Sequence, residues 1–261
     1  MTAAAVLAAV PKATSSAAPG EPATDQRSLE LAARLAGAIL RPIKQVDDSF
    51  LRLAPLTAQH VRAASALPAF ASAINRAVRS DIESRGLALP RDFGRRLADR
   101  SSSRLAVLLV TEPIELINRA ARMLAGAILH RQVLALMLKD QRAAARAVMG
   151  EEAFLAATQE VPMLNPSLGL LDKGRLKIQS LIQPDIAEAQ KMRFLAFGGE
   201  ALSRFTDTAE ASLSSFFACR LPPAARPDDS SRAIAGMTEG QCTHVIKLLR
   251  RRLPEWADFI S

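Results

Sequence analysis

Residues Thr111 to Pro162 read TEPIELINRAARMLAGAILHRQVLALMLKDQRAAARAVMGEEAFLAATQEVP, and they carry the clearest helical pattern in the chain. Thr111, Glu112 and Pro113 predict a helix start, because they combine a capping oxygen, a first-turn acid and a proline whose missing N–H costs nothing there. Apolar residues then recur at steps of three and four: Ile114, Ile117, Ala121, Leu124 and Ile128. This spacing places them on one face of a helix.

The same stretch predicts where further helices begin and end. Asp140 is placed to cap a helix over Gln141 to Met149, and Gly150 is placed to end it with a left-handed residue. Glu151 then restarts a helix that Pro162 would stop. Helices joined by such short connections pack antiparallel, so we predict an all-α fold, a compact multi-helix domain.

Composition agrees with a helical, reduced protein. Of the 261 residues, 49% are hydrophobic and 23% are charged, which is ordinary for a globular protein. Ten Phe, one Trp and no Tyr are too few aromatic residues for a typical β-sandwich. The two cysteines, Cys219 and Cys242, form no C-x-x-C motif, which predicts a cytoplasmic protein without disulfides. No apolar run approaches the ~20 residues of a membrane-spanning helix.

Proline-rich and polar segments divide the chain into four parts. We predict a disordered leader over residues 1–26, a helical core over 27–221, a linker over 222–236 and a carboxy-terminal helical segment over 237–261 that packs on the core. Thr238 and Gln241 predict a capping box at the start of the last helix.

Glycines mark two further boundaries within the core. The stretch from Pro68 to Arg85 repeats an apolar residue every four positions from Phe70 onward, which predicts a helix that Gly86 closes. Gly198-Gly199 predict a turn between two helices, the second opening at Glu200.

The sequence lacks the motifs of nucleotide-binding loops, zinc proteases and serine hydrolases. His60, His130 and His244 are separated by seventy residues or more, and none has another ligand three or four positions away. The acidic pairs Asp47-Asp48 and Glu151-Glu152 stand at predicted helix starts, where capping explains them better than acid–base chemistry. We therefore expect no catalytic residues, no metal site and no cofactor.

The formal charge is +8, from 34 Lys plus Arg against 26 Asp plus Glu. With a pI near 10.3, this excess fits nucleic acid, an acidic protein or an anionic membrane as a partner. It fits equally well with solvated helix faces that meet no partner at all.

One basic cluster suggests a binding surface near the carboxy terminus. Lys247, Arg250, Arg251 and Arg252 occupy about one and a half helical turns just before Trp256. We hypothesise that these five residues bind a partner, with Trp256 as an exposed anchor. The alternatives are a solvated last turn whose cations complement the helix dipole, and a tryptophan that caps the core.

The order of several features resembles the SctK-type proteins of bacterial type III secretion, accessory components of the sorting platform. Four segments carry the resemblance: Phe50 to Pro55 with His60 and Leu67-Pro68; Gly86-Leu87, Asp92-Phe93 and Arg104 to Leu109; Ala125 to His130 with Ala143 to Gly150, Glu151 and Phe154; and Leu248 to Arg250 with Leu253 to Trp256. The chain departs from the family in lacking aromatic residues around His60.

The resemblance implies a non-enzymatic, all-α adaptor in the cytoplasm, at the inner face of the bacterial inner membrane. In the family, such a protein links the cytoplasmic domain of the inner-membrane ring protein to the pod protein, and through it to the stalk and the secretion ATPase. The alternative from another class is a basic helical protein that binds nucleic acid. Because no helix-turn-helix with a polar recognition face stands out, we rank that alternative lower.

Overall fold

A computed structural model describes residues 23–87, 89–90, 101–172, 174–183, 187–209, 211–223 and 237–260, with side chains except at 23–25, 101–102 and 187. Asp92-Phe93, most of the predicted leader and nearly all of the predicted linker lie outside this part. The described residues form helices and no strands, which confirms the predicted all-α class. Helix α1 begins at Ala23, inside the predicted leader.

The α-helices in chain order are α1 (Ala23–Leu40), α2 (Ala58–Ala66), α3 (Pro68–Ser84), α4 (Ser101–Thr111), α5 (Ile114–Leu134), α6 (Lys139–Met149), α7 (Glu151–Leu155), α8 (Val161–Leu164), α9 (Ile178–Leu181), α10 (Ala187–Ala209), α11 (Ala211–Arg220) and α12 (Glu239–Arg252). Shorter turns are the 3-10 helices η1 (Pro42–Lys44), η2 (Asp48–Phe50), η5 (Pro166–Leu171) and η8 (Pro254–Trp256), and the π-helical turn η4 (Ala156–Glu160).

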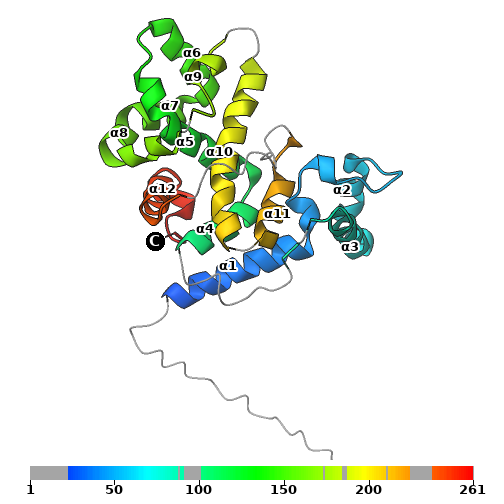
Figure 1. The fold of residues 1–261 in the computed structure, drawn as a ribbon. Coiled ribbons are helices and arrows are strands. Elements are labelled where there is room, and N and C mark those ends of the chain that lie inside the picture. Colours follow the sequence, from blue (N-terminus) through cyan, green and yellow to red (C-terminus); the bar gives the residue numbers. More distant parts are fainter. Residues whose placement is uncertain are drawn as a thin grey trace, which may run out of the picture.

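Helix α10 runs lengthwise through the molecule (Figure 1). It packs on α5, α4 and α11, and their buried apolar side chains belong to one continuous core. Figure 1 places α6 and α9 at one end of α10 and α1 at the other, with α2 and α3 on one side and α12 on the opposite side. Helix α12 begins with the predicted capping box of Thr238 and Gln241 and packs on α4 and η5.

The contact between α5 and α10 depends on a glycine. A Cβ atom at Gly198 would overlap the carbonyl oxygen of Ala121, a backbone atom of α5 that no side-chain rotation can move away. Gly198 and Gly199 lie inside α10, so the predicted turn between two helices is wrong, and Glu200 does not open a helix. Gly198 allows two helix backbones to meet closely, and the chain does not reverse direction there.

Two predicted caps are also wrong. Thr111 is the last residue of α4, and its hydroxyl donates to the Val107 carbonyl oxygen at 2.9 Å rather than capping α5. Asp140 lies in the first turn of α6, which already begins at Lys139 without a side-chain cap. Pro113 does precede α5, as predicted, and Gly150 ends α6 with a φ of 85°.

Pro162 does not stop the helix that begins at Glu151. The π-helical turn η4 precedes it, and Pro162 is the second residue of α8, where an α-helix needs no N–H donor. The chain therefore stays helical from Glu151 to Leu164.

Helix α3 matches its predicted range, and Gly86 follows it with a φ of 80°. Its apolar stripe is only partly buried, however. Val78 and Ile82 lie in the core, whereas Phe70 is 55% exposed. The first turn of α3 extends beyond the core, so the periodic pattern continues onto an exposed surface.

Replacing Gly198 by Ala should destabilise the protein, because the new methyl group must push α5 and α10 apart. We expect the free energy of unfolding to fall by about 1–3 kcal/mol, measured by urea denaturation. Gly37, inside α1 with open space around it, is the matched control. Gly37→Ala should raise stability by up to about 1 kcal/mol through helix propensity. Equal effects of the two substitutions would contradict the close contact.

Candidate functional site

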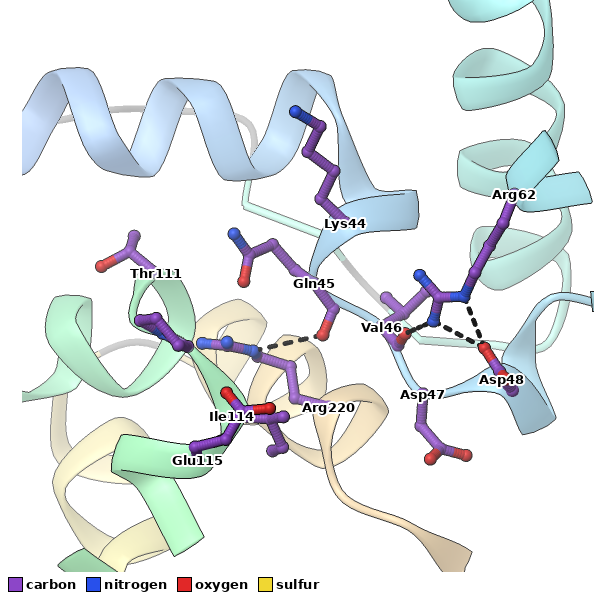
Figure 2. A pocket seen from close by; sticks show the side chains of 11 residues that line it. Lys44, Gln45, Val46, Asp47, Asp48, Arg62, Thr111, Ile114, Glu115 and Arg220 are labelled. Atoms are coloured by element: carbon purple, nitrogen blue, oxygen red, sulfur yellow. Dashed lines mark hydrogen bonds and ion pairs between the residues drawn. The ribbon is translucent and has the colours of Figure 1, made fainter. Parts of the chain in front are cut away.

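A surface hollow lies between the amino-terminal segment, the junction of α4 with α5, and the end of α11. Its volume is about 570 Å³. Figure 2 shows side chains from these three regions facing it. The lining residues are Lys44, Gln45, Val46, Asp47, Asp48, Arg62, Thr111, Pro113, Ile114, Glu115 and Arg220. We call this hollow the Arg220 cleft.

Arg220 is the buried charge of this cleft. Its guanidinium donates through Nη1 to the Leu109 carbonyl oxygen at 2.7 Å and through Nη2 to the Glu112 carbonyl oxygen. Its Nε also donates to the Gln45 carbonyl oxygen at 3.3 Å (Figure 2). Because Leu109 lies in the last turn of α4, the cation is placed at the negative end of that helix dipole.

Burial lowers the pKa of Arg220 to about 9, and the nearby carboxylates of Glu112 and Glu115 oppose that shift. The side chain is therefore still a cation at neutral pH. It is 2% exposed, and three backbone carbonyl groups hold it in place. The geometry makes Arg220 a structural joint between α11, the junction of α4 with α5 and the amino-terminal segment, because its donors are engaged by carbonyl oxygens of these elements.

The rest of the cleft gives no preference for a charged ligand. Three cationic side chains, Lys44, Arg62 and Arg220, face three acids, Asp47, Asp48 and Glu115. Arg62 is already engaged, since its Nε donates to Asp48 at 2.7 Å and its Nη2 to the Val46 carbonyl oxygen at 3.1 Å. The described lining contains no histidine or cysteine that could act as a base or nucleophile.

The predicted basic cluster on α12 divides into two parts. Arg251 and Arg252 both bind the carboxylate of Glu160, at 2.8 Å through Nη1 and at 2.6 Å through Nε. The side chain of Glu160 is only 8% exposed, so these arginines compensate an acid inside the molecule. Lys247 and Arg250 are exposed and form no ion pair within the described chain.

Trp256 is not an exposed anchor. The residue is fully buried in η8, which corrects that part of the hypothesis and confirms the alternative of a tryptophan in the core. Its neighbours Leu253 and Ile260 are also fully buried. The surface that remains for a partner on α12 therefore consists of Lys247 and Arg250, which we call the α12 cation pair.

The three histidines lie apart, each with a local partner. His60 Nδ1 lies 3.1 Å from the Thr57 hydroxyl, His130 Nδ1 donates to the Ala127 carbonyl oxygen at 2.8 Å, and His244 Nδ1 lies 2.7 Å from Asn165 Oδ1. Among the described residues, no three His, Cys, Asp or Glu side chains are grouped so as to hold a metal ion. None of the described helices is long and apolar enough to cross a membrane.

Comparison of the chain with protein-family models, with curated proteins and with solved structures finds no match. Its own residues therefore carry the functional argument. Sequence reasoning missed the Arg220 cleft, because its lining comes from segments far apart in the chain, at residues 44–62, 111–115 and 220. It also missed Glu160, the acid that engages two of the predicted cations.

Replacing Arg220 by Met should lower the free energy of unfolding by about 3 kcal/mol or more, because two buried carbonyl oxygens and one partly buried carbonyl oxygen lose their donor. Urea denaturation followed by circular dichroism measures this change. Arg250→Met, at an exposed and unpaired position, should change stability by no more than about 0.5 kcal/mol. If the Arg220 variant unfolded like the wild type, the joint would be dispensable.

His130 should make stability depend on pH. Burial lowers its pKa from the ordinary value of 6.5, helped by nearby Arg131 and opposed by the Ala127 hydrogen bond. As pH falls below that ordinary value, the unfolded chain takes up the proton first. The contribution of His130 to stability is therefore complete above this pH and declines below it.

The test compares urea midpoints at about pH 7.5 and pH 5.5, on either side of the ordinary histidine pKa. The wild type should lose stability at the lower pH, and His130→Gln should lose less. His60→Gln, at an exposed position, should keep the wild-type difference. The same pH dependence in all three proteins would remove His130 as its source.

Proposed function

We propose that this chain is a non-enzymatic cytoplasmic adaptor of a type III protein secretion apparatus. It would link the cytoplasmic domain of the inner-membrane ring protein to the pod protein of the sorting platform, and indirectly to the stalk and the ATPase. The observation that carries the proposal is the resemblance, over Phe50 to Trp256, to the order of features in SctK-type proteins.

The residues of that resemblance are mainly packing residues. Phe50, the apolar residues from Leu105 to Leu109, Phe154 and Trp256 are all buried in the same core. A resemblance at core positions is evidence for a similar packing of the whole molecule, and less for a similar surface patch. It supports a shared helical scaffold, which is what an adaptor needs in order to hold two neighbours at a fixed separation.

The scaffold presents two exposed features of different chemistry. The α12 cation pair lies on one side of α10, and the corner between α2 and α3 lies on the other (Figure 1). At that corner Leu67 is 53% exposed and Phe70 is 55% exposed. The surrounding sequence, from Ala63 to Asn75, contains no charged residue. We call this surface the α2–α3 corner.

These two surfaces are suited to different contacts. The cation pair favours an acidic face through steering and rim contacts, whereas Leu67 and Phe70 favour an apolar face that excludes water. The core between them has no described break at α4, α10 or α11. We infer that one neighbour binds each side, with the helical core as the rigid spacer.

A pull-down from lysate of the source organism tests the proposal, with the full chain as bait, washes at moderate salt and partners identified by mass. We expect a ring protein and a pod protein of a secretion apparatus. Lys247→Glu with Arg250→Glu should lose one of them, and Leu67→Ser with Phe70→Ser should lose the other. Each double variant should stay folded, since all four positions are exposed.

The control is Arg251→Glu with Arg252→Glu, which has the same charge change but breaks the Glu160 ion pairs. It should lower stability and reduce recovery of both partners together. Nucleic acid recovered alone, and released steeply by salt, would overturn the adaptor and favour the basic nucleic-acid-binding alternative. If both double variants recovered both partners, the assignment of the two surfaces would be wrong.

A further inference from the structure

The connection between α5 and α6 exposes apolar side chains at one end of the molecule. Met137 is 88% exposed, Leu138 is 62% exposed, and Leu134 in the last turn of α5 is 47% exposed. Leu136 lies between them in sequence and is buried, so it anchors the connection to the core. Figure 1 shows α6 at the end of the molecule opposite α1. We call Leu134, Met137 and Leu138 the apolar tip.

Exposed cations surround this tip. Arg131 lies one helical turn before Leu134, and Lys139 directly follows Leu138. Arg142 is one turn into α6, where its N–H donates to the Leu138 carbonyl oxygen at 3.1 Å. Lys177 lies beside the end of α5, because the N–H of the next residue, Ile178, donates to Gln132 Oε1 at 2.7 Å.

None of these four cations forms an ion pair within the described chain, unlike Arg251 and Arg252. The acids nearby are Asp140, in the first turn of α6, and Asp172, which accepts from Gln132 Nε2 at 2.6 Å. Among the described residues, the surroundings of the tip therefore have a net positive charge without compensating ion pairs.

The chemistry of the tip and its surroundings argues for one kind of occupant. Neither the Arg220 cleft nor the hollow lined by Arg119, Arg122 and Met149 includes a residue of the tip. Apolar side chains on a projecting connection, with lysine and arginine around them, match the division of a membrane surface into acyl chains and anionic headgroups.

We propose that the apolar tip docks the protein on an anionic lipid surface, with Met137 and Leu138 entering the interfacial region and the four cations contacting headgroups. The chain would then be a peripheral membrane protein through this end. The inference does not depend on the adaptor proposal, because it uses neither the α12 cation pair nor the α2–α3 corner.

Co-sedimentation of the full chain with vesicles tests this proposal. The probe is phosphatidylcholine vesicles with about 30% phosphatidylglycerol, compared with phosphatidylcholine alone. The wild type should bind the anionic vesicles and release them as salt rises, because salt screens exposed charges. Met137→Ser with Leu138→Ser should weaken binding about tenfold or more. Serine is compatible with the helix start, since Leu138 is the N-cap residue of α6.

Matched control variants distinguish binding through the tip from nonspecific binding by other exposed apolar side chains or other cations. Leu67→Ser with Phe70→Ser removes exposed apolar side chains elsewhere and should bind vesicles like the wild type. Lys139→Gln with Arg142→Gln should weaken binding, whereas Lys247→Gln with Arg250→Gln, which removes the same charge from α12, should weaken it much less. The leader is identical in every variant, so it cannot produce these differences.

Three results would overturn the proposal. The first is a wild type that does not sediment with anionic vesicles. The second is equal vesicle binding by the tip variant and the α2–α3 corner variant. The third is a wild type that light scattering shows to be a dimer and that Met137→Ser with Leu138→Ser converts to a monomer, because the tip would then be covered by a second copy of this chain.

Discussion

The close contact of α5 with α10 at Gly198 is the constraint on which the rest of the fold depends. With no room for a Cβ atom against Ala121, the two longest helices approach at backbone distance. Gly126 of α5 repeats the arrangement toward α7, where a Cβ atom would stand 2.9 Å from the Ala153 carbonyl oxygen. Ala121 and Gly126 are small, so α5 packs closely against α10 on one side and against α7 on another. The helices at either end of α10 are then positioned by a central pair that cannot slide without a backbone clash.

Arg220 extends this central unit to the amino-terminal helices. It joins carbonyl oxygens of Leu109 and Glu112 to that of Gln45, and the Asp47 N–H donates to the Cys219 carbonyl oxygen at 2.9 Å. The segment that leads to α2 and α3 is therefore hydrogen-bonded to α11, and its Ile43 and Val46 side chains are buried in the core. Arg62 of α2 adds an exposed ion pair with Asp48 of the same segment.

The local sequence pattern was sufficient to predict that the fold is all-α, because the three-to-four spacing of apolar residues is a property of one segment alone. It was insufficient wherever a distant segment decides the outcome. From the local sequence, Gly198 looks like a turn residue. In the structure it is a helix residue that lies against the Ala121 carbonyl oxygen of α5. Arg251 and Arg252 look free until Glu160, more than ninety positions away, engages both. Trp256 was ambiguous for the same reason. The Arg220 cleft left no sequence signal, since main-chain carbonyl groups, which every residue has, provide its key contacts.

Pairing within the chain is what distinguishes the proposed contact surfaces from the rest of a basic molecule. Much of the arginine excess is directed inward or to nearby acids, as with Arg119, which binds Glu152 through Nε at 2.7 Å and Nη2 at 2.8 Å. Cations paired in this way have few free donors for a hydrogen bond or ion pair with a partner. The α12 cation pair and the cations of the apolar tip have no such partner among the described residues, and the α2–α3 corner contains no charged residue. The three proposed contact surfaces differ in chemistry and are held apart by one core, so partners bound at them would not compete for the same site. That separation favours a molecule whose role is to position its neighbours, because each contact can be lost without disturbing the core that carries the others.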